Sequence, residues 1–105
     1  MKYFIGIFLL LFYTTGFAYT IKGAGTISCG RYIDDKRNSP GLEHVANMHW
    51  VQGFITGVNY SSTKNYGSGI DMIAMAQYLE NYCQDHPLNN LAEASEKLLN
   101  ALQNR

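Results

Sequence analysis

Two cysteines, Cys29 and Cys83, constrain the fold of this chain most, because its N-terminus indicates export. An apolar run over residues 3–13 follows one basic residue, and the small residues Gly16 and Ala18 stand where a signal peptidase reads the chain. This pattern is typical of a secretory signal peptide over residues 1–18, cleaved after Ala18. A retained anchor is the alternative, but the run is well short of the ~20 apolar residues that span a bilayer.

Export places both cysteines in an oxidising compartment, so we expect a Cys29–Cys83 disulfide. It would close a loop of about 55 residues and contribute about 4 kcal/mol in the chain-entropy estimate. The remaining chain, residues 19–105, is long enough for one domain with one modest core, so this is a large share of its stability. Metal ligation and a nucleophilic thiol are the competing interpretations. The three histidines do not supply further ligands at suitable spacing, so no metal is expected.

The charge of the chain argues against two classes of partner. Without Lys2, seven basic residues stand against eight acidic ones, which gives a formal net charge of −1. No run of Lys or Arg is present that could neutralise phosphates. We therefore expect no nucleic acid partner and, after cleavage of the leader, no membrane partner.

The hydrophobic periodicity predicts an all-α fold, a small bundle of about four helices that forms a single domain over residues 19–105 and is stapled by one disulfide. Residues 19–28 are expected as an extended or loose lead-in. Ser28, Asp71 and Asn90 are suitable N-caps, and Glu93 completes a capping box with Asn90. The expected helices run over residues 29–37, from 42 to about 61, from 71 to 82 or 83, and from about 90 onward.

Gly53 and Gly57 lie one turn apart inside the long helix, where each costs roughly 1 kcal/mol relative to alanine. The close approach of a neighbouring helix would compensate this cost. We therefore expect a helix-packing surface at Gly53 and Gly57, with Trp50 and Phe54 filling the space beside the glycines. Trp50 could instead anchor an interface, but a core position is the commoner one for a tryptophan in the middle of an apolar helix.

Three motifs resemble a known family when they are taken together: "SCGRY" at 28–32, "WVQGFITGVN" at 50–59 and "YLENYCQDHPLNNLAEA" at 78–94. The chain resembles the small periplasmic Rap/Tai-type immunity proteins. The resemblance implies a four-helix, single-disulfide domain in the periplasm that binds and blocks a toxic effector, typically a peptidoglycan amidase of a type VI secretion system. The same plan is similar to the HdeA-type acid-stress chaperones, which carry more charged residues, so a periplasmic chaperone or envelope stress factor is the alternative function.

The polar stretch 61–69 is the best candidate for a functional loop, because it is longer than the usual connection between helices. Tyr60, Lys64, Asn65 and Tyr66 combine aromatic and adaptable polar groups, which suits a protein-binding surface. A solvated loop without a partner is the alternative. Asn59 is expected to bond a loop backbone, with a bond to a partner as the alternative, and self-association of two copies is left open.

We expect no catalytic residue, no cofactor and no enzymatic activity. Glu80 has no second carboxylate or histidine at a spacing that acid–base catalysis requires. His44 and His49 are five residues apart and point to different helix faces, and with His86 they form no ligand set. Their protonation below about pH 6.5 would make them at most a weak acid sensor.

Overall fold

The fold is all-α, as predicted, and the computed structural model describes residues 20–38 and 41–105. The predicted leader therefore lies outside the described residues. Five elements follow one another along the chain: the 3₁₀ turn η1 (Gly23–Thr26) and the helices α2 (Cys29–Asn38), α3 (Leu42–Ser62), α4 (Met72–Asp85) and α5 (Leu91–Gln103). The lead-in contains a short helical turn where an extended segment was expected.

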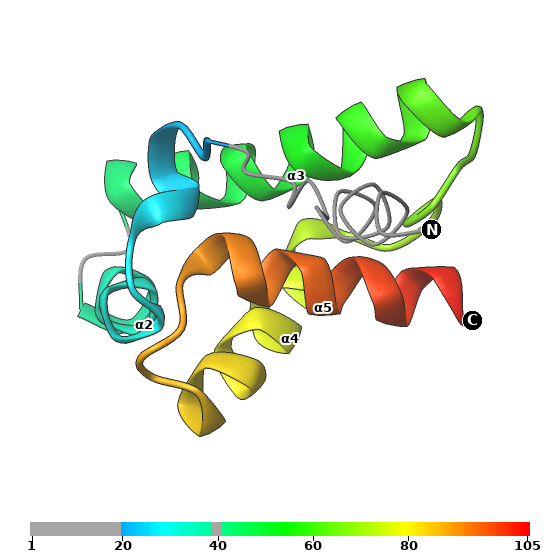
Figure 1. Cartoon of the computed structure of the whole chain (residues 1–105). Coiled ribbons are helices and arrows are strands. Elements are labelled where there is room, and N and C mark those ends of the chain that lie inside the picture. Colours follow the sequence, from blue (N-terminus) through cyan, green and yellow to red (C-terminus); the bar gives the residue numbers. More distant parts are fainter. Residues whose placement is uncertain (1–19, 39–40) are drawn as a thin grey trace, which may run out of the picture.

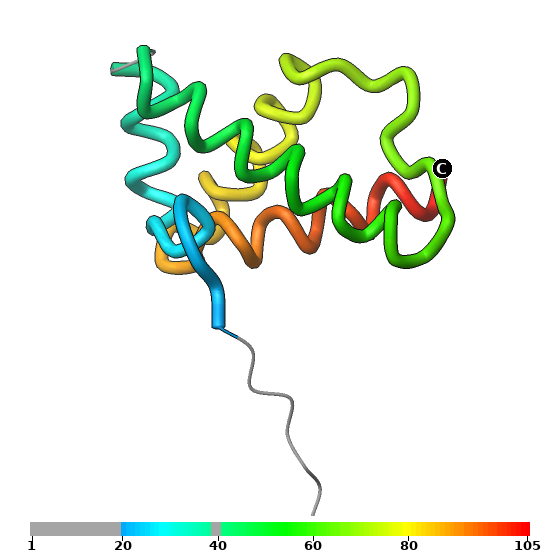
Figure 2. Tube along the Cα trace, turned by 90° about the horizontal axis from the view of Figure 1, so that it is seen from above, coloured from blue at the N-terminus to red at the C-terminus, as the bar shows by residue number. Residues whose placement is uncertain are grey.

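Helices α3 and α5 pack against each other, and α2 and α4 pack at the end where α3 begins (Figure 1). The turn η1 contacts both α3 and α5. The connection between α3 and α4 lies at the opposite end of the molecule, beside the C-terminal end of α5 (Figure 2). The fold thus separates a disulfide-bonded end from an end that presents the polar loop.

The predicted N-caps are confirmed by hydrogen bonds at three helix starts. Ser28 Oγ accepts from the backbone N–H of Arg31 at 3.0 Å, and Asp71 Oδ1 accepts from Ala74 at 2.8 Å. Asn90 and Glu93 form the expected capping box at the start of α5. Each cap satisfies a backbone donor that the first turn of a helix leaves free, which is why these helices begin where the sequence predicts.

The core is built from the helix faces that point inward. Met48, Val51 and Ile55 are the buried apolar positions of α3, spaced at helical intervals, and Leu79 and Leu98 meet them from α4 and α5. Burial of such side chains stabilises the fold by roughly 1.5–3 kcal/mol each. The hydroxyl of Tyr32, which α2 contributes to this core, donates to Ala76 O at 3.1 Å, so its one polar group is satisfied.

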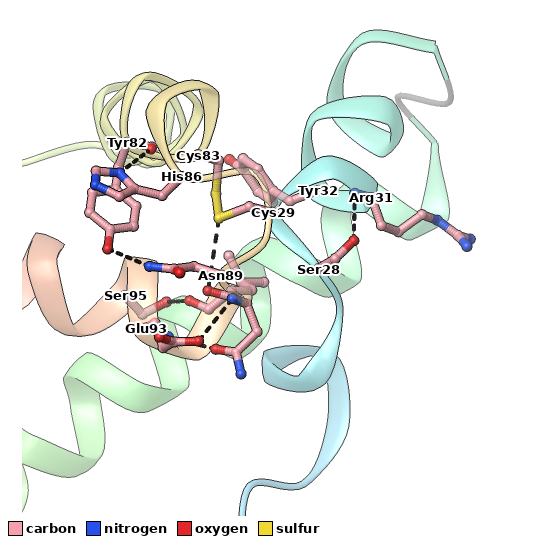
Figure 3. The surroundings of a disulfide bond; sticks show 12 residues. Ser28, Cys29, Arg31, Tyr32, Tyr82, Cys83, His86, Asn89, Glu93 and Ser95 are labelled. Carbon is pink, nitrogen blue, oxygen red and sulfur yellow. Dashed lines mark hydrogen bonds between the residues drawn. A yellow bond between two sulfur atoms is a disulfide. The ribbon is translucent and has the colours of Figure 1, made fainter.

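The disulfide joins Cys29, at the start of α2, to Cys83, near the end of α4 (Figure 3). Both cysteines are completely buried. Backbone bonds fix the same region, because Cys29 N–H donates to Asn89 O at 2.7 Å and Leu91 N–H donates to Ile27 O at 2.9 Å. The predicted pairing is confirmed, and it leaves neither thiol available for metal ligation or nucleophilic attack.

The expected helix-packing surface at Gly53 and Gly57 is wrong. Both glycines are exposed, and a Cβ built on either would meet no atom within 4 Å. Met48, Val51 and Ile55 form the face of α3 that packs against the rest of the protein, and the two glycines lie on the opposite face. No described helix therefore compensates the propensity cost of these two glycines.

A glycine in the lead-in makes the close approach instead. A Cβ on Gly25 would lie 2.7 Å from Trp50 Cε2, so no larger residue fits there without displacing the ring. Trp50 is half-buried against the core and stacks on Phe54, with ring centroids 5.8 Å apart. Its indole N–H donates to Lys22 O at 2.7 Å. Trp50 thus fills space beside η1, and both Trp50 and Phe54 pack against the core.

Candidate functional site

The segment between α3 and α4 turns away from the helix at Thr63. Thr63 has left-handed backbone angles (φ 52°), and Lys64 N–H donates to Asn59 O at 3.1 Å, which closes the last turn of α3. Further along, Gly67 has φ 83°, a conformation that favours glycine. A Cβ there would come within 3.2 Å of Met75 Cε, so the loop lies tightly against the protein at this point.

Asn59 ties the loop to the end of α3 through both ends of its side-chain amide. Its Nδ2 donates to Tyr66 O at 3.0 Å, and its Oδ1 accepts from Tyr66 N–H at 2.9 Å. This pair of bonds resembles the paired backbone hydrogen bonds between two β-strands, and it satisfies the N–H and C=O groups of Tyr66. The structural role expected for Asn59 is confirmed.

The four predicted partner-binding residues do not form one cluster. Tyr60 is 89% exposed on the outer side of α3, and Lys64 is exposed at the beginning of the loop. Asn65 and the half-buried Tyr66 instead line a pocket between the loop and α3. Nothing in the geometry tests their binding role, which stays a prediction.

This pocket, which we call the amide pocket, has a volume of about 300 Å³. Its walls are mostly uncharged polar side chains, and its floor is formed by the buried Ile55 and Met75. The lining residues are Gln52, Ile55, Thr56, Asn59, Asn65, Tyr66, Gly67, Ser68, Ile70 and Met75.

Sequence reasoning missed the helix wall of the amide pocket. Gln52, Thr56 and Asn59 stand four and three residues apart, a spacing that places them on one helix face. Three uncharged polar residues on one face of α3 were a signal that could have identified the wall. The packing surface was instead predicted on another face of the helix, that of Gly53 and Gly57.

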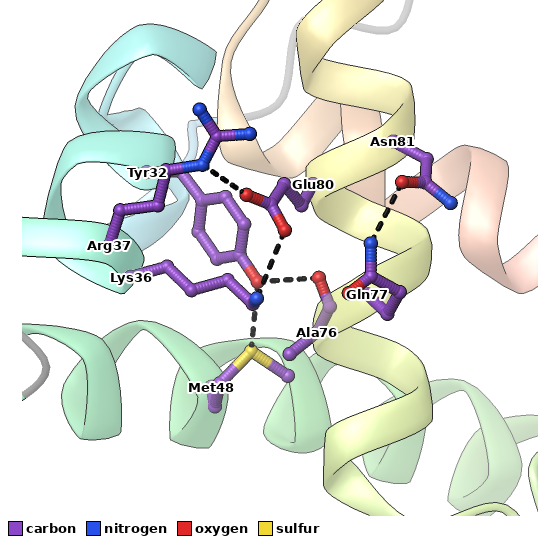
Figure 4. A network of polar contacts seen from close by, with 8 residues as sticks. All are labelled: Tyr32, Lys36, Arg37, Met48, Ala76, Gln77, Glu80 and Asn81. Carbon is purple, nitrogen blue, oxygen red and sulfur yellow. Dashed lines mark hydrogen bonds and ion pairs between the residues drawn. The ribbon is translucent and has the colours of Figure 1, made fainter.

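Three charged groups meet elsewhere, between α2 and α4 (Figure 4). Glu80 is buried and accepts from Lys36 Nζ at 3.0 Å and from Arg37 Nε at 2.6 Å. These hydrogen bonds, the one from Lys36 first, lower the pKa of Glu80. Glu80 therefore fastens two helices to each other, a structural role that the sequence did not reveal.

Asp35 forms a second buried carboxylate on the other side of α2. It accepts from Arg31 Nε at 2.8 Å and from Asn47 Nδ2 at 3.0 Å. Burial alone would raise the pKa of Asp35, but the hydrogen bonds from Arg31 and Asn47 outweigh it and the pKa is lowered. Both buried carboxylates thus remain ionised to a lower pH than exposed ones.

The histidines are spread over the molecule and do not meet. Burial, followed by the charge of Lys36, lowers the pKa of His44. His86 stacks on Tyr82 at the end of α4, with ring centroids 4.2 Å apart, and His49 is exposed. Over residues 20–38 and 41–105, no three His, Cys, Asp or Glu side chains lie where they could hold a metal ion. Nor does any helix in these ranges have the length and apolar character to cross a membrane.

Comparison with known proteins gives no relative. No family model, no curated protein and no solved structure matches the chain.

Proposed function

We propose that this chain is an exported, non-enzymatic protein that binds a partner protein through the segment 60–66. The observation that carries this proposal is the pair of hydrogen bonds between Asn59 and Tyr66, which holds the segment in one conformation while Tyr60 and Lys64 stay exposed. A surface that is ordered before binding loses less conformational entropy in the complex. Tyrosine is also among the residues that contribute most at interfaces.

The most specific form of the proposal is an immunity protein for a cell-wall amidase delivered by a type VI secretion system. Its support is the resemblance carried by the three motifs at 28–32, 50–59 and 78–94. An immunity protein performs no chemistry, because it only has to fill or cover the active site of its target. The disulfide fits residence in the oxidising periplasm, where such a target would act.

The test uses an amidase-type effector encoded beside this chain, expressed in the periplasm of a bacterial host. Full-length protein should restore growth of the host, and a Tyr60→Ala/Lys64→Glu variant should not. Gln84→Ala, on the exposed side of the last turn of α4, is the matched control and should protect fully. Tyr66 is a poor choice for this test, because its side chain is half-buried and lines the amide pocket, so its replacement would also change the packing of the loop. Unchanged protection by the double variant would refute the loop assignment, and the lack of an adjacent effector gene would count against the immunity role.

A periplasmic acid-stress chaperone is the second candidate, and the two buried carboxylates favour it. Protonation of Glu80 and Asp35 would remove the ionic contacts of α2 while the disulfide still holds Cys29 to Cys83. Such a partly opened chain would expose apolar core surface. The test compares binding of a hydrophobic dye and prevention of client aggregation at about pH 2–3, the range of strong acid stress, with the same measurements at about pH 7. Dye binding that does not change on acidification would exclude this role.

A further inference from the structure

The amide pocket combines four polar side chains that have no hydrogen-bond partner within the described chain: Gln52, Thr56, Asn65 and Ser68. Some polar side chains just outside the pocket are satisfied internally. The hydroxyls of Ser61 and Ser62 both donate to Val58 O, and Asp71 caps α4. The pocket gathers its four donor and acceptor side chains in one concave place.

The chemical character of these groups restricts the ligand. No Asp, Glu, Lys, Arg or His is among the ten residues that line the pocket. A charged ligand would lose water without gaining an opposite charge, so the pocket disfavours it. Side-chain amides and hydroxyls both donate and accept hydrogen bonds, and each can pair with a ligand hydroxyl in either direction.

The size and the apolar surfaces of the pocket narrow the ligand further. A volume of about 300 Å³ is at the lower end of ligand pockets, and it admits one ring and not an extended chain. Ile55 and Met75 provide the apolar floor, and the half-buried Ile70 and Tyr66 also line the pocket. A saccharide ring has this combination of features, with hydroxyls around its edge and C–H groups on its faces.

The pocket is also formed in advance of any ligand. Asn59 fixes Tyr66 through two hydrogen bonds, Ser68 N–H donates to Asn65 O at 3.2 Å, and Ile70 N–H donates to Gly67 O at 2.9 Å. These bonds set the position of the loop wall against α3. A ligand would therefore bind without first ordering the loop, which lowers the entropic cost of binding a small molecule.

We infer that the amide pocket binds one uncharged saccharide ring. Gln52 and Asn65 pair with ring hydroxyls from opposite walls, Thr56 and Ser68 add single hydrogen bonds, and the apolar floor covers one face of the sugar. Asn65 and Tyr66 belong both to the proposed partner-binding segment and to the pocket, whereas Tyr60 and Lys64 do not line the pocket. The Tyr60→Ala/Lys64→Glu variant therefore tests partner binding with the pocket intact, and Gln52→Ala tests sugar binding with segment 60–66 intact.

The test is a nuclear magnetic resonance titration of the disulfide-bonded protein with glucose and with N-acetylglucosamine at millimolar concentrations. The side-chain amides of Gln52 and Asn65 and the backbone amides of residues 66–68 should shift and saturate. Gln52→Ala should weaken binding about tenfold, the loss expected for a two-bond amide contact. Gln84→Ala is the control and should bind as the unchanged protein does, and an unaltered spectrum away from the pocket shows that each variant is folded.

Three further probes test whether the pocket prefers a single neutral sugar over a charged sugar, a sugar oligomer or a peptide. Glucuronic acid has the same ring with a carboxylate, and it should bind more weakly than glucose. A soluble N-acetylglucosamine oligomer should bind with the affinity of the single sugar, because the pocket holds one ring. The inference is overturned if neither neutral sugar shifts the pocket resonances, if glucuronic acid binds as well as glucose, or if the oligomer binds more than about tenfold tighter. It is also overturned if acetylated glutamine amide, a neutral peptide probe, saturates the pocket and the sugars do not.

Discussion

Replacing Gly53 and Gly57 by alanine should stabilise the protein. Both positions are helical, neither has a positive φ, and a Cβ at either meets no atom within 4 Å. Alanine is favoured over glycine in a helix interior by about 0.5–1 kcal/mol, mainly because it restricts the unfolded chain. The new methyl groups are exposed and add no packing, so this backbone effect is the whole expected gain.

The double variant should therefore gain about 1–2 kcal/mol, which corresponds to a rise in Tm of roughly 5–15 °C for a domain of this size. Thermal and urea unfolding of the oxidised protein, followed by far-ultraviolet circular dichroism, measure the gain. The urea midpoint should rise while the slope m stays constant. Gly25→Ala is the contrasting variant, because its Cβ collides with the ring of Trp50 and should cost about 1–3 kcal/mol.

An unchanged or lowered Tm of the Gly53→Ala/Gly57→Ala variant would refute this reasoning. It would mean that a contact outside the described chain requires the two glycines. A stabilisation by Gly25→Ala equal to that of the double variant would show instead that the position of the Trp50 ring against η1 is wrong.

Three other perturbations have defined outcomes. Glu80→Gln should cost about 1–2 kcal/mol at neutral pH, since both of its cationic partners are partly exposed. Because the pKa of Glu80 is lowered in the folded protein, its contribution to the free energy of unfolding is fully present above the ordinary carboxyl pKa of 4.5. The contribution is lost as the pH falls through the folded-state pKa. In urea unfolding, the stabilities of the variant and the unchanged protein should therefore converge in acid. Replacing Cys29 and Cys83 together by alanine should lower the free energy of unfolding by about 4 kcal/mol, measured by urea unfolding; a loss below 1 kcal/mol, as a rough limit, would contradict the loop-closure estimate. Asn59→Ala should speed hydrogen exchange of the Tyr66 amide about tenfold with a smaller effect on Tm, and equal exchange rates would disprove the tie between helix and loop.

The helix boundaries were predictable because they depend on local chemistry. Ser28, Asp71 and Asn90 act within one turn of their own position, so a single sequence shows them. The start of α3 at Leu42 and its end one residue beyond the expected Ser61 follow from the apolar spacing and the polar loop. The disulfide was also predictable, since two cysteines allow one pairing.

The features that the sequence did not reveal depend on which faces of distant elements meet. Gly53 and Gly57 have the spacing of a packing motif, but the orientation of α3 is set by Met48, Val51 and Ile55 on its other side. Glu80 meets its cations across 43 and 44 residues of sequence. No local pattern predicts these encounters. The amide pocket is an intermediate case, because its helix wall follows a visible spacing and its loop wall depends on the turn at Thr63.

Trp50 gives the protein a built-in optical probe. The chain has one tryptophan, and its indole donates to Lys22 O and covers Gly25. Its emission therefore reports whether the N-terminal segment is seated on α3, while circular dichroism reports the helices as a whole. A fluorescence transition that precedes the loss of ellipticity would identify release of this segment as a separate step, without any label added to the chain.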